Sequence, residues 1–161
     1  MTEATRLAHV VLDGESLTRL SPLLEADRAQ AVADLEHENH FALPPGDRDF
    51  PPGPYMLHLS VQEGRLVFDV RDREDAPLTA IVLALGPFRS IIKDYQLLVD
   101  SHMLAVEEGR AERIQAIDMG RRGLHNEGAS LLRTRLENKA DIDHETARRL
   151  FTLVCVLHQR I

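Results

Sequence analysis

The sequence predicts an α+β fold: a single antiparallel sheet, made of an N-terminal strand and a three-strand meander, covered by about four helices. Strand patterns dominate the first half of the chain and helical patterns the second, a segregation typical of α+β rather than α/β proteins. The meander strands follow one another too closely for crossover helices, so they should pair antiparallel. The 161 residues fit one domain, 1–161, that can bury a core without metal or disulfide help.

A strand and an amphipathic helix are expected first. The segment "RLAHVVLD", residues 6–13, is rich in β-branched residues and is followed by Gly14, which favours a strand that ends in a turn. Residues 21–40 begin with Ser21, a suitable N-cap, and Pro22, which fits the first helical position. Apolar residues then recur with the helical period, so this segment is predicted to form a helix.

Residues 43–54, "LPPGDRDFPPGP", contain five prolines and two glycines. Proline fixes φ and lacks a backbone donor, so we expect an irregular loop here. The loop is either a lid over a site or a surface excursion, and the sequence leaves both possibilities open.

Residues 56–71 carry the clearest local pattern. Apolar and polar residues alternate on both sides of Glu63-Gly64, which predicts an antiparallel hairpin with one apolar face. A third strand is predicted at 78–85. Its apolar residues fall on both faces, which predicts a central position in the sheet.

Three helices are predicted in the second half of the chain, at about 87–108, at about 110–137 and from the N-cap Asp143 onward. The last of them has the widest apolar stripe, so we expect it to be central and nearly surrounded. The residues expected to form a common core are Leu57, Leu59, Leu66, Phe68, Ile91, Leu124, Leu150 and Val154.

Charge is distributed unevenly along the chain. Residues 1–109 carry 9 basic and 19 acidic side chains, whereas residues 110–161 carry 10 basic and 7 acidic ones. The formal net charge of −7 weighs against non-specific nucleic-acid binding but leaves open a local basic face in the C-terminal part. Arginine supplies 17 of the 19 basic residues, and its planar fork suits carboxylate or phosphate partners.

The sequence also indicates the compartment of the protein and its relation to membranes. The one cysteine, Cys155, lies in an apolar run, so we expect an inert core thiol and a reducing compartment. The first residues lack the pattern of a signal peptide, and every apolar run is too short to span a bilayer. These features predict a cytoplasmic protein with no membrane partner.

The stretch "AIDMGRRGLHNEGASLL", residues 116–132, is the most unusual of the chain. On a helix, Asp118, Arg121, Arg122 and His125 stand at i, i+3, i+4 and i+7 and are neighbours on one surface. In a structural interpretation, Asp118 pairs with Arg121 and the glycines admit a close helix. In a functional one, Arg121, Arg122 and His125 hold a phosphate or carboxylate, Asp118 orients a side chain and His125 can act as an acid or base.

The three glycines of this stretch leave a further alternative. If they break the helix, successive backbone amides can form an anion-binding nest. The stretch matches no phosphate-binding loop, dinucleotide fingerprint or nucleophile elbow, so its chemical specificity is low. The catalytic residues are therefore unknown, and the four side chains are candidate ligand-binding residues only.

Metal and cofactor sites are not predicted. His37 and His40 stand at i and i+3, a spacing that two metal ligands can share. A zinc site normally needs three or four protein ligands, and no second pair with matching spacing is present. We therefore expect no metal centre and no cofactor.

Four segments together resemble a known family. They are "PYMLHLSVQEGRLVFDVRD", "PFRSIIKDYQLLVDS", "IQAIDMGRRGLHNEGASLL" and "TARRLFTLVCVLH". In this order and spacing they are similar to the uncharacterised bacterial protein family UPF0262, with a likeness that runs from residue 6 to 158. The resemblance implies a single soluble bacterial domain. It brings no activity, substrate, cofactor or catalytic residue.

Three hypotheses for the function follow. The leading one is a non-enzymatic binding or regulatory domain that recognises a protein or a small anionic ligand, since the chain lacks a catalytic motif and is rich in arginine. The second is an enzyme that acts on a phosphorylated or carboxylated metabolite through the strip of Asp118, Arg121, Arg122 and His125. The third is RNA binding through the basic C-terminal part. A homo-oligomer is compatible with each of them.

Overall fold

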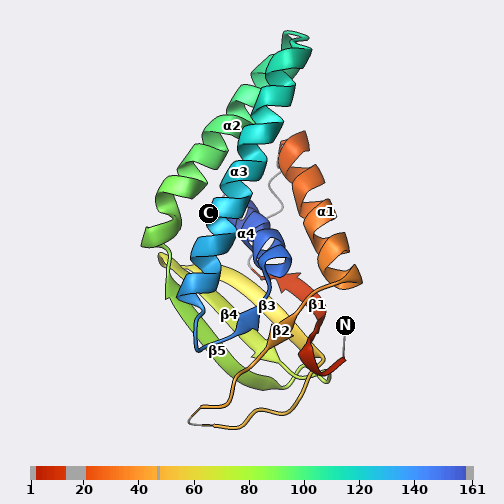
Figure 1. The fold of residues 1–161 in the computed structure, drawn as a ribbon, viewed down its shortest axis with the longest axis vertical. Coiled ribbons are helices and arrows are strands. Elements are labelled where there is room, and N and C mark those ends of the chain that lie inside the picture. The colour runs from red at the N-terminus through yellow and green to blue at the C-terminus, as the bar shows by residue number, and fades with distance from the viewer. Residues whose placement is uncertain (1–2, 14–20, 47, 159–161) are drawn as a thin grey trace.

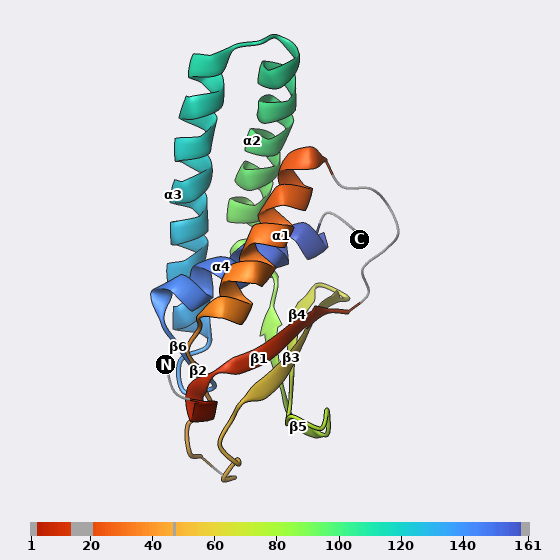
Figure 2. The same ribbon diagram turned by 90° about the vertical axis from the view of Figure 1, so that its right-hand side faces the viewer.

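A sheet and a layer of helices make up the protein, with the helices on one face of the sheet (Figures 1 and 2). The computed structural model describes residues 3–13, 21–46 and 48–158. The predicted α+β class is confirmed, with four α-helices and a main sheet of four strands. Within these described ranges, no helix is both long enough and apolar enough to cross a membrane.

The main sheet has the strand order β1-β3-β4-β5. Its strands are β1 (Leu7–Leu12), β3 (Tyr55–Gln62), β4 (Arg65–Arg71) and β5 (Pro77–Ala84). The predicted hairpin of β3 and β4 is confirmed, and β4 pairs antiparallel with β5. Alternation along β3 and β4 buries one face, so the core side of the sheet was visible in the sequence.

Two expectations about this sheet are wrong. The sheet is mixed, because β1 pairs parallel with β3. Between these two strands the chain passes through a helix and a long loop and returns to the same end of the sheet, as a parallel pair requires. Strand β5 lies at an edge and not in the centre, and its second apolar face is left exposed at Val82, which is 46% accessible. Gly14, expected to follow the first strand, lies outside the described residues.

The four helices follow the predicted boundaries closely. They are α1 (Pro22–His37), α2 (Arg89–Glu107), α3 (Ala111–Arg135) and α4 (His144–His158). The Ser21 hydroxyl accepts a hydrogen bond from the Leu24 amide at 3.4 Å, and the Asp143 carboxylate accepts one from the Thr146 amide at 2.8 Å. These contacts confirm both predicted N-caps.

Several short elements were not predicted from the sequence. Strands β2 (Phe41–Ala42) and β6 (Asp141–Ile142) form a second, two-stranded antiparallel sheet. One 3₁₀ turn, η1 (Glu3–Thr5), precedes β1 and another, η2 (Gly86–Phe88), leads into α2. Elements of two or three residues are too short to show a hydrophobic period.

Helix α4 occupies the centre of the protein. It lies between α1 and α3 and above the sheet (Figures 1 and 2), and every residue from Thr146 to Leu157 except Arg148 and Arg149 is buried. The expected core is confirmed for all its members but one, Leu124, which is half-buried against the others. Helices α2 and α3 form a hairpin whose tip extends away from the sheet (Figure 2).

Candidate functional site

Helix α3 carries the unusual stretch and runs through it without a break. The backbone nest expected from broken glycines is therefore not formed. Gly128 has a packing role, because a Cβ atom at this position would lie 2.3 Å from ring atoms of Phe151. Only glycine allows α3 and α4 to approach this closely. At Gly123 a Cβ atom would meet nothing within 4 Å, so packing inside the chain does not explain that glycine.

Arg121 lies at the junction of three helices. Its guanidinium donates to Asp27 of α1 at 2.7 Å and to Asp118 of α3 at 3.0 Å. The Tyr95 hydroxyl of α2 donates to the other carboxylate oxygen of Asp27. Burial opposes the charge of Arg121, but the neighbouring carboxylates outweigh this effect and raise its pKa. The predicted pairing of Asp118 with Arg121 is confirmed, and the guanidinium is shared between two internal partners.

His125 is buried one turn further along α3, with 4% of its surface accessible. Its ring lies against that of Tyr95, with the centroids 5.0 Å apart. Its Nε2 atom has no hydrogen-bond partner among the described residues. Burial above all, together with the positive charges of Arg121 and Arg148, lowers the pKa of His125 to about 3. The ring is therefore neutral near pH 7.

The structure brings together three of the four predicted site residues. Asp118, Arg121 and His125 lie in one cluster with the partly exposed Asp118 at its rim, whereas the side chain of Arg122 is exposed on the outside of α3. Sequence reasoning missed Asp27 and Tyr95. A signal for Asp27 was present, because this carboxylate falls on the apolar stripe of α1, three residues after the buried Leu24. The arrangement favours the structural interpretation, since each charge has an internal partner.

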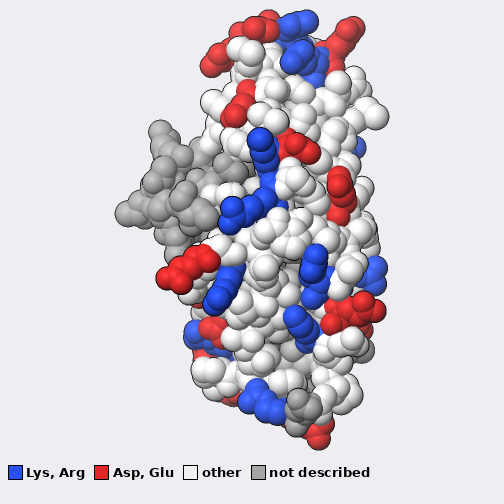
Figure 3. Space-filling view, turned by 90° about the vertical axis from the view of Figure 1, so that its left-hand side faces the viewer, with Lys and Arg blue, Asp and Glu red and all other residues white. Residues whose placement is uncertain are grey.

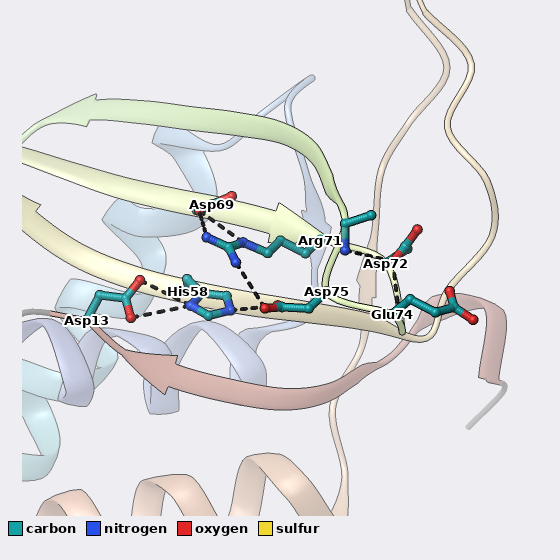
Figure 4. A network of polar contacts seen from close by, with 8 residues as sticks. Asp13, His58, Asp69, Arg71, Asp72, Glu74 and Asp75 are labelled. Atoms are coloured by element: carbon teal, nitrogen blue, oxygen red, sulfur yellow. Dashed lines mark hydrogen bonds and ion pairs between the residues drawn. The ribbon is translucent and has the colours of Figure 1, made fainter.

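A second polar cluster lies on the face of the sheet that faces away from the helices. Figure 4 shows the His58 ring between two carboxylates, with Nδ1 3.1 Å from Asp13 and Nε2 2.9 Å from Asp75. Arg71 donates to Asp69 at 2.8 Å and to Asp75 at 3.0 Å. The cluster joins the residue after β1 to the middle of β3 and to the turn between β4 and β5.

The charged groups of this cluster stabilise one another. Burial lowers the pKa of His58, but its hydrogen bonds to Asp75 and Asp13 outweigh burial, so the pKa is raised. The hydrogen bond from His58 lowers the pKa of Asp75. Both ring nitrogens are engaged, and no group of three or more metal-ligating side chains occurs among the described residues. His40, considered above as a metal ligand, instead lies 3.2 Å from Asp141.

The free edge of β5 combines an open backbone with an adjoining groove. The Leu85 amide donates to the Gly64 carbonyl, on the β4 side of the strand. Because backbone groups alternate in direction along an antiparallel strand, every second residue before Leu85 directs its N–H and C=O groups toward β4. Ala80, Val82 and Ala84 therefore point their N–H and C=O groups outward. No other strand of the described chain pairs with this edge. These three residues offer an open row of donors and acceptors.

A groove follows this edge. It consists of three adjoining hollows of about 610, 500 and 480 Å³ between β5, the end of α3 and the start of the proline-rich loop. Asn138, from the turn after α3, lines all three hollows, so they lie next to one another. Their volumes fall in the range of ligand-binding clefts. The groove is a space that a bound chain segment can enter.

Basic side chains predominate along this groove. They are Arg48, Arg133, Arg135 and Lys139, against the acidic Glu137 and Asp141. Arg48 already donates to the Leu78 carbonyl and lies 4.9 Å from the Phe50 ring, and Asp141 is engaged by His40. Figure 3 views the side of the molecule where β5 and the base of α2 lie, and shows both basic and acidic side chains on a largely uncharged surface. The groove is positive although the chain is negative.

The proline-rich loop 43–54 has no regular structure, as expected. Its first half borders the groove, and through Arg48 it covers the Leu78 carbonyl at one end of the edge. Pro44, Gly46 and Phe50 of the loop line one hollow together with residues 79–82 of β5. Sequence reasoning missed this groove because the edge position of β5 depends on pairing between distant segments.

Comparison with known proteins identifies relatives over nearly the whole chain. Residues 4–160 match the model of the Uncharacterised protein family (UPF0262). A UPF0262 protein of Granulibacter bethesdensis is 67% identical over 163 residues, which cover 97% of this chain and 91% of the relative. One of Acidiphilium cryptum is 61% identical and covers 96% and 93%, and one of Rhodospirillum rubrum is 48% identical and covers 99% and 96%. No solved structure matches the chain.

Proposed function

This chain belongs to the uncharacterised protein family UPF0262, and we propose that it is a non-enzymatic binding domain that takes up an extended segment of a protein partner along β5. The observation that carries this proposal is the free edge of β5 beside a groove. The strand, "PLTAIVLA", is eight residues long and contains no charged residue. Proteins commonly protect an exposed edge with lysine, proline, an inward charge or a bulge. Here Pro77 and the irregular register beside it lie at one end of the strand, and residues 79–84 carry none of these features, which favours pairing with another chain.

Strand addition explains how such a surface binds. The outward N–H and C=O groups of Ala80, Val82 and Ala84 hydrogen-bond to the backbone of an extended segment, which supplies affinity for many sequences. Alternate side chains of the segment then point into the groove and supply specificity. Arg135 and Lys139 have no ion-pair partner among the described residues, so they favour acidic side chains in the segment.

A selected peptide tests this proposal. The probe is the tightest-binding sequence recovered from a displayed library of random peptides of about 12 residues, synthesised and added to the full chain. We expect amide hydrogen exchange to slow at Ala80, Val82 and Ala84, because these amides gain partners. A peptide N-methylated at alternate residues loses its donors on one edge and should not bind. Protection confined to other elements, or equal binding of the methylated peptide, contradicts the proposal.

The two alternatives have weaker support. An enzyme acting on a phosphorylated or carboxylated metabolite needs Arg121 free to hold the anion, whereas this guanidinium is engaged by Asp27 and Asp118. RNA binding usually uses aromatic side chains on which bases stack. The large apolar side chains that are exposed in the described chain are valines, leucines and methionines, without an aromatic residue.

A further inference from the structure

The hairpin of α2 and α3 carries a second surface that no described residue from elsewhere in the chain covers. Its distal half extends beyond the other helices (Figure 2). Within the described residues seven large apolar side chains are exposed, and five of them lie on this hairpin: Leu97, Met103, Leu104, Val106 and Met119. Exposed apolar residues on a projecting element are typical of an interaction surface, and three of these five, Leu97, Leu104 and Met119, face the same side of the hairpin.

One face of α2 has a symmetrical pattern. Leu97 and Leu104 are two helical turns apart, so they lie on the same side of the helix, and they are 55% and 51% accessible. Lys93 stands four residues before the first leucine, and Glu108, which lies 3.5 Å from Arg110 of its own chain, stands four residues after the second. The order along this face is basic, apolar, apolar, acidic, and its midpoint falls between Asp100 and Ser101.

We propose that two copies of the chain pair through this face, with their α2 helices antiparallel about a two-fold axis near Asp100 and Ser101. This arrangement places Leu97 of each copy against Leu104 of the other. It also places Lys93 of each copy opposite Glu108 of the other, so each half of the contact has a complementary charge pair. A two-fold interface of this kind is self-complementary and closes, which limits the assembly to a dimer.

The neighbouring helix widens the same face. Tyr95 and His125 mark the core side of the hairpin, because their rings are in contact. At about 100° per residue, Met119 and Gly123 of α3 fall on the opposite side of the hairpin, beside the two leucines. Met119 is 70% accessible, and Gly123 has open space where a Cβ atom would be. A second copy that packs close to α3 uses that space and accounts for a glycine that packing within the chain leaves unexplained.

One feature sets the strength of the pairing. The two Asp100 carboxylates approach each other near the axis, and like charges at short distance weaken association. Asp100 accepts a hydrogen bond at 2.8 Å from Gln96 of the same helix. This bond does not neutralise the charge of the carboxylate. We therefore expect a dimer that dissociates on dilution, and Asp100→Asn should make it tighter.

Sedimentation equilibrium of the full chain measures this dimer directly. Leu104→Glu should raise the dissociation constant at least about tenfold, because it removes two buried leucine contacts and adds two charges. The matched control is Val106→Glu, which changes a residue of similar exposure half a turn away from Leu97 and should leave the constant unchanged. Lys93→Glu and Glu108→Lys should each weaken the dimer, and their combination in one chain should restore it. A monomer at all concentrations, or a dimer that Leu104→Glu leaves intact, overturns the proposal.

Disulfide cross-linking tests which residues of the two α2 helices face each other, and it does not depend on the stability of the variants. In a Cys155→Ala background, an equimolar mixture of the Leu97→Cys and Leu104→Cys proteins should form a disulfide between copies. Leu97→Cys alone should not, because the two cysteines would be about 10 Å apart along the helices, beyond the reach of a disulfide. Efficient cross-linking of Leu97→Cys to itself contradicts the proposed register. A dimer broken by Val82→Lys, and not by Leu104→Glu, assigns self-association to β5 instead.

Discussion

The two edge strands of the main sheet differ in how their outward backbone groups are covered. At β1, the side-chain amide of Asn39 accepts from the Leu7 N–H at 2.7 Å and donates to the Leu7 carbonyl at 2.9 Å, as a neighbouring strand would. At β5, the outward groups of Ala80, Val82 and Ala84 face a groove. Each edge is therefore covered by a side chain at one end, but at β1 the buried Asn39 pairs both the donor and the acceptor of Leu7, whereas at β5 Arg48 pairs only the Leu78 carbonyl.

The same contrast extends into the two sides of the molecule. On the closed side, which contains β1 and α1, polar groups have internal partners: Asn39 binds the Leu7 backbone, and Asp27 binds Arg121. On the open side, which contains β5 and the end of α3, Arg135 and Lys139 have no ion-pair partner within the described chain. We therefore expect substitutions on the closed side to change stability and substitutions on the open side to change binding.

The largest loss of stability should come from Arg121→Ala. Removing this guanidinium leaves the Asp27 carboxylate buried without its main partner, and breaking a buried pair costs about 3–5 kcal/mol. Urea unfolding measures the change, and Arg122→Ala, on the exposed neighbour, should stay within about 0.5 kcal/mol of the wild type. If Arg121→Ala instead keeps its stability, and phosphate stabilises the wild type alone, the strip is a ligand site.

A smaller loss is expected from Asn39→Leu. This change leaves the Leu7 amide and carbonyl without partners at a buried edge, which costs about 2–3 kcal/mol. Hydrogen exchange at Leu7 should become faster at the same time. Asn126→Leu serves as the control, because Asn126 is exposed and its hydrogen bond is to a surface histidine. Unchanged exchange at Leu7 would show that the strand edge is closed by something else.

The His58 cluster should make stability depend on pH, with an effect smaller than either substitution. Its raised pKa means that the protonated ring stabilises the fold fully below the ordinary histidine pKa, and that this contribution is lost as the pH rises through the raised value. The lowered pKa of Asp75 removes the same contribution from the acid side as the pH falls through it. Urea unfolding from about pH 5 to pH 9 should show the alkaline slope, and measurements extended below about pH 4 should show the acidic one. In His58→Gln the alkaline slope should disappear, and its persistence would assign the effect to other groups.

The smallest change in stability should come from the open side. Val82→Lys adds a charge to an exposed edge position, so the free energy of unfolding should change by no more than about 0.5 kcal/mol. Binding of the selected peptide should nevertheless be lost, because a lysine on an edge strand discourages strand addition. Val11→Lys, at a comparably exposed position on the opposite edge strand, is the matched control and should bind normally. Equal binding by both variants would separate the peptide site from β5.

Local features of the fold were predictable from the sequence. The caps Ser21 and Asp143 act on amides three residues away, and the hairpin turn at Glu63-Gly64 depends on its own φ angles, 49° and 74°. Such signals are complete within one segment. The parallel pairing of β1 and the edge position of β5 depend on which distant segments meet, and hydrophobic alternation is the same for either outcome.

The candidate sites divide in the same way. The pair of Asp118 and Arg121 was predictable because both side chains lie on one helix at i, i+3. Asp27, which binds the same guanidinium, is 94 residues away in the chain, and Asp75 reaches His58 across a strand pair. The groove beside β5 is formed by three segments that share no sequence pattern, so the structure was needed to find it.

The position of α4 has a consequence for the biosynthesis of the protein. This helix is the last described element of the chain, yet the sheet, α1 and α3 all pack against it. A chain emerging from the ribosome therefore presents these elements before the helix that covers their apolar faces has been made. Folding is completed only when α4 has left the ribosome, and until then the nascent chain exposes the surfaces that chaperones recognise.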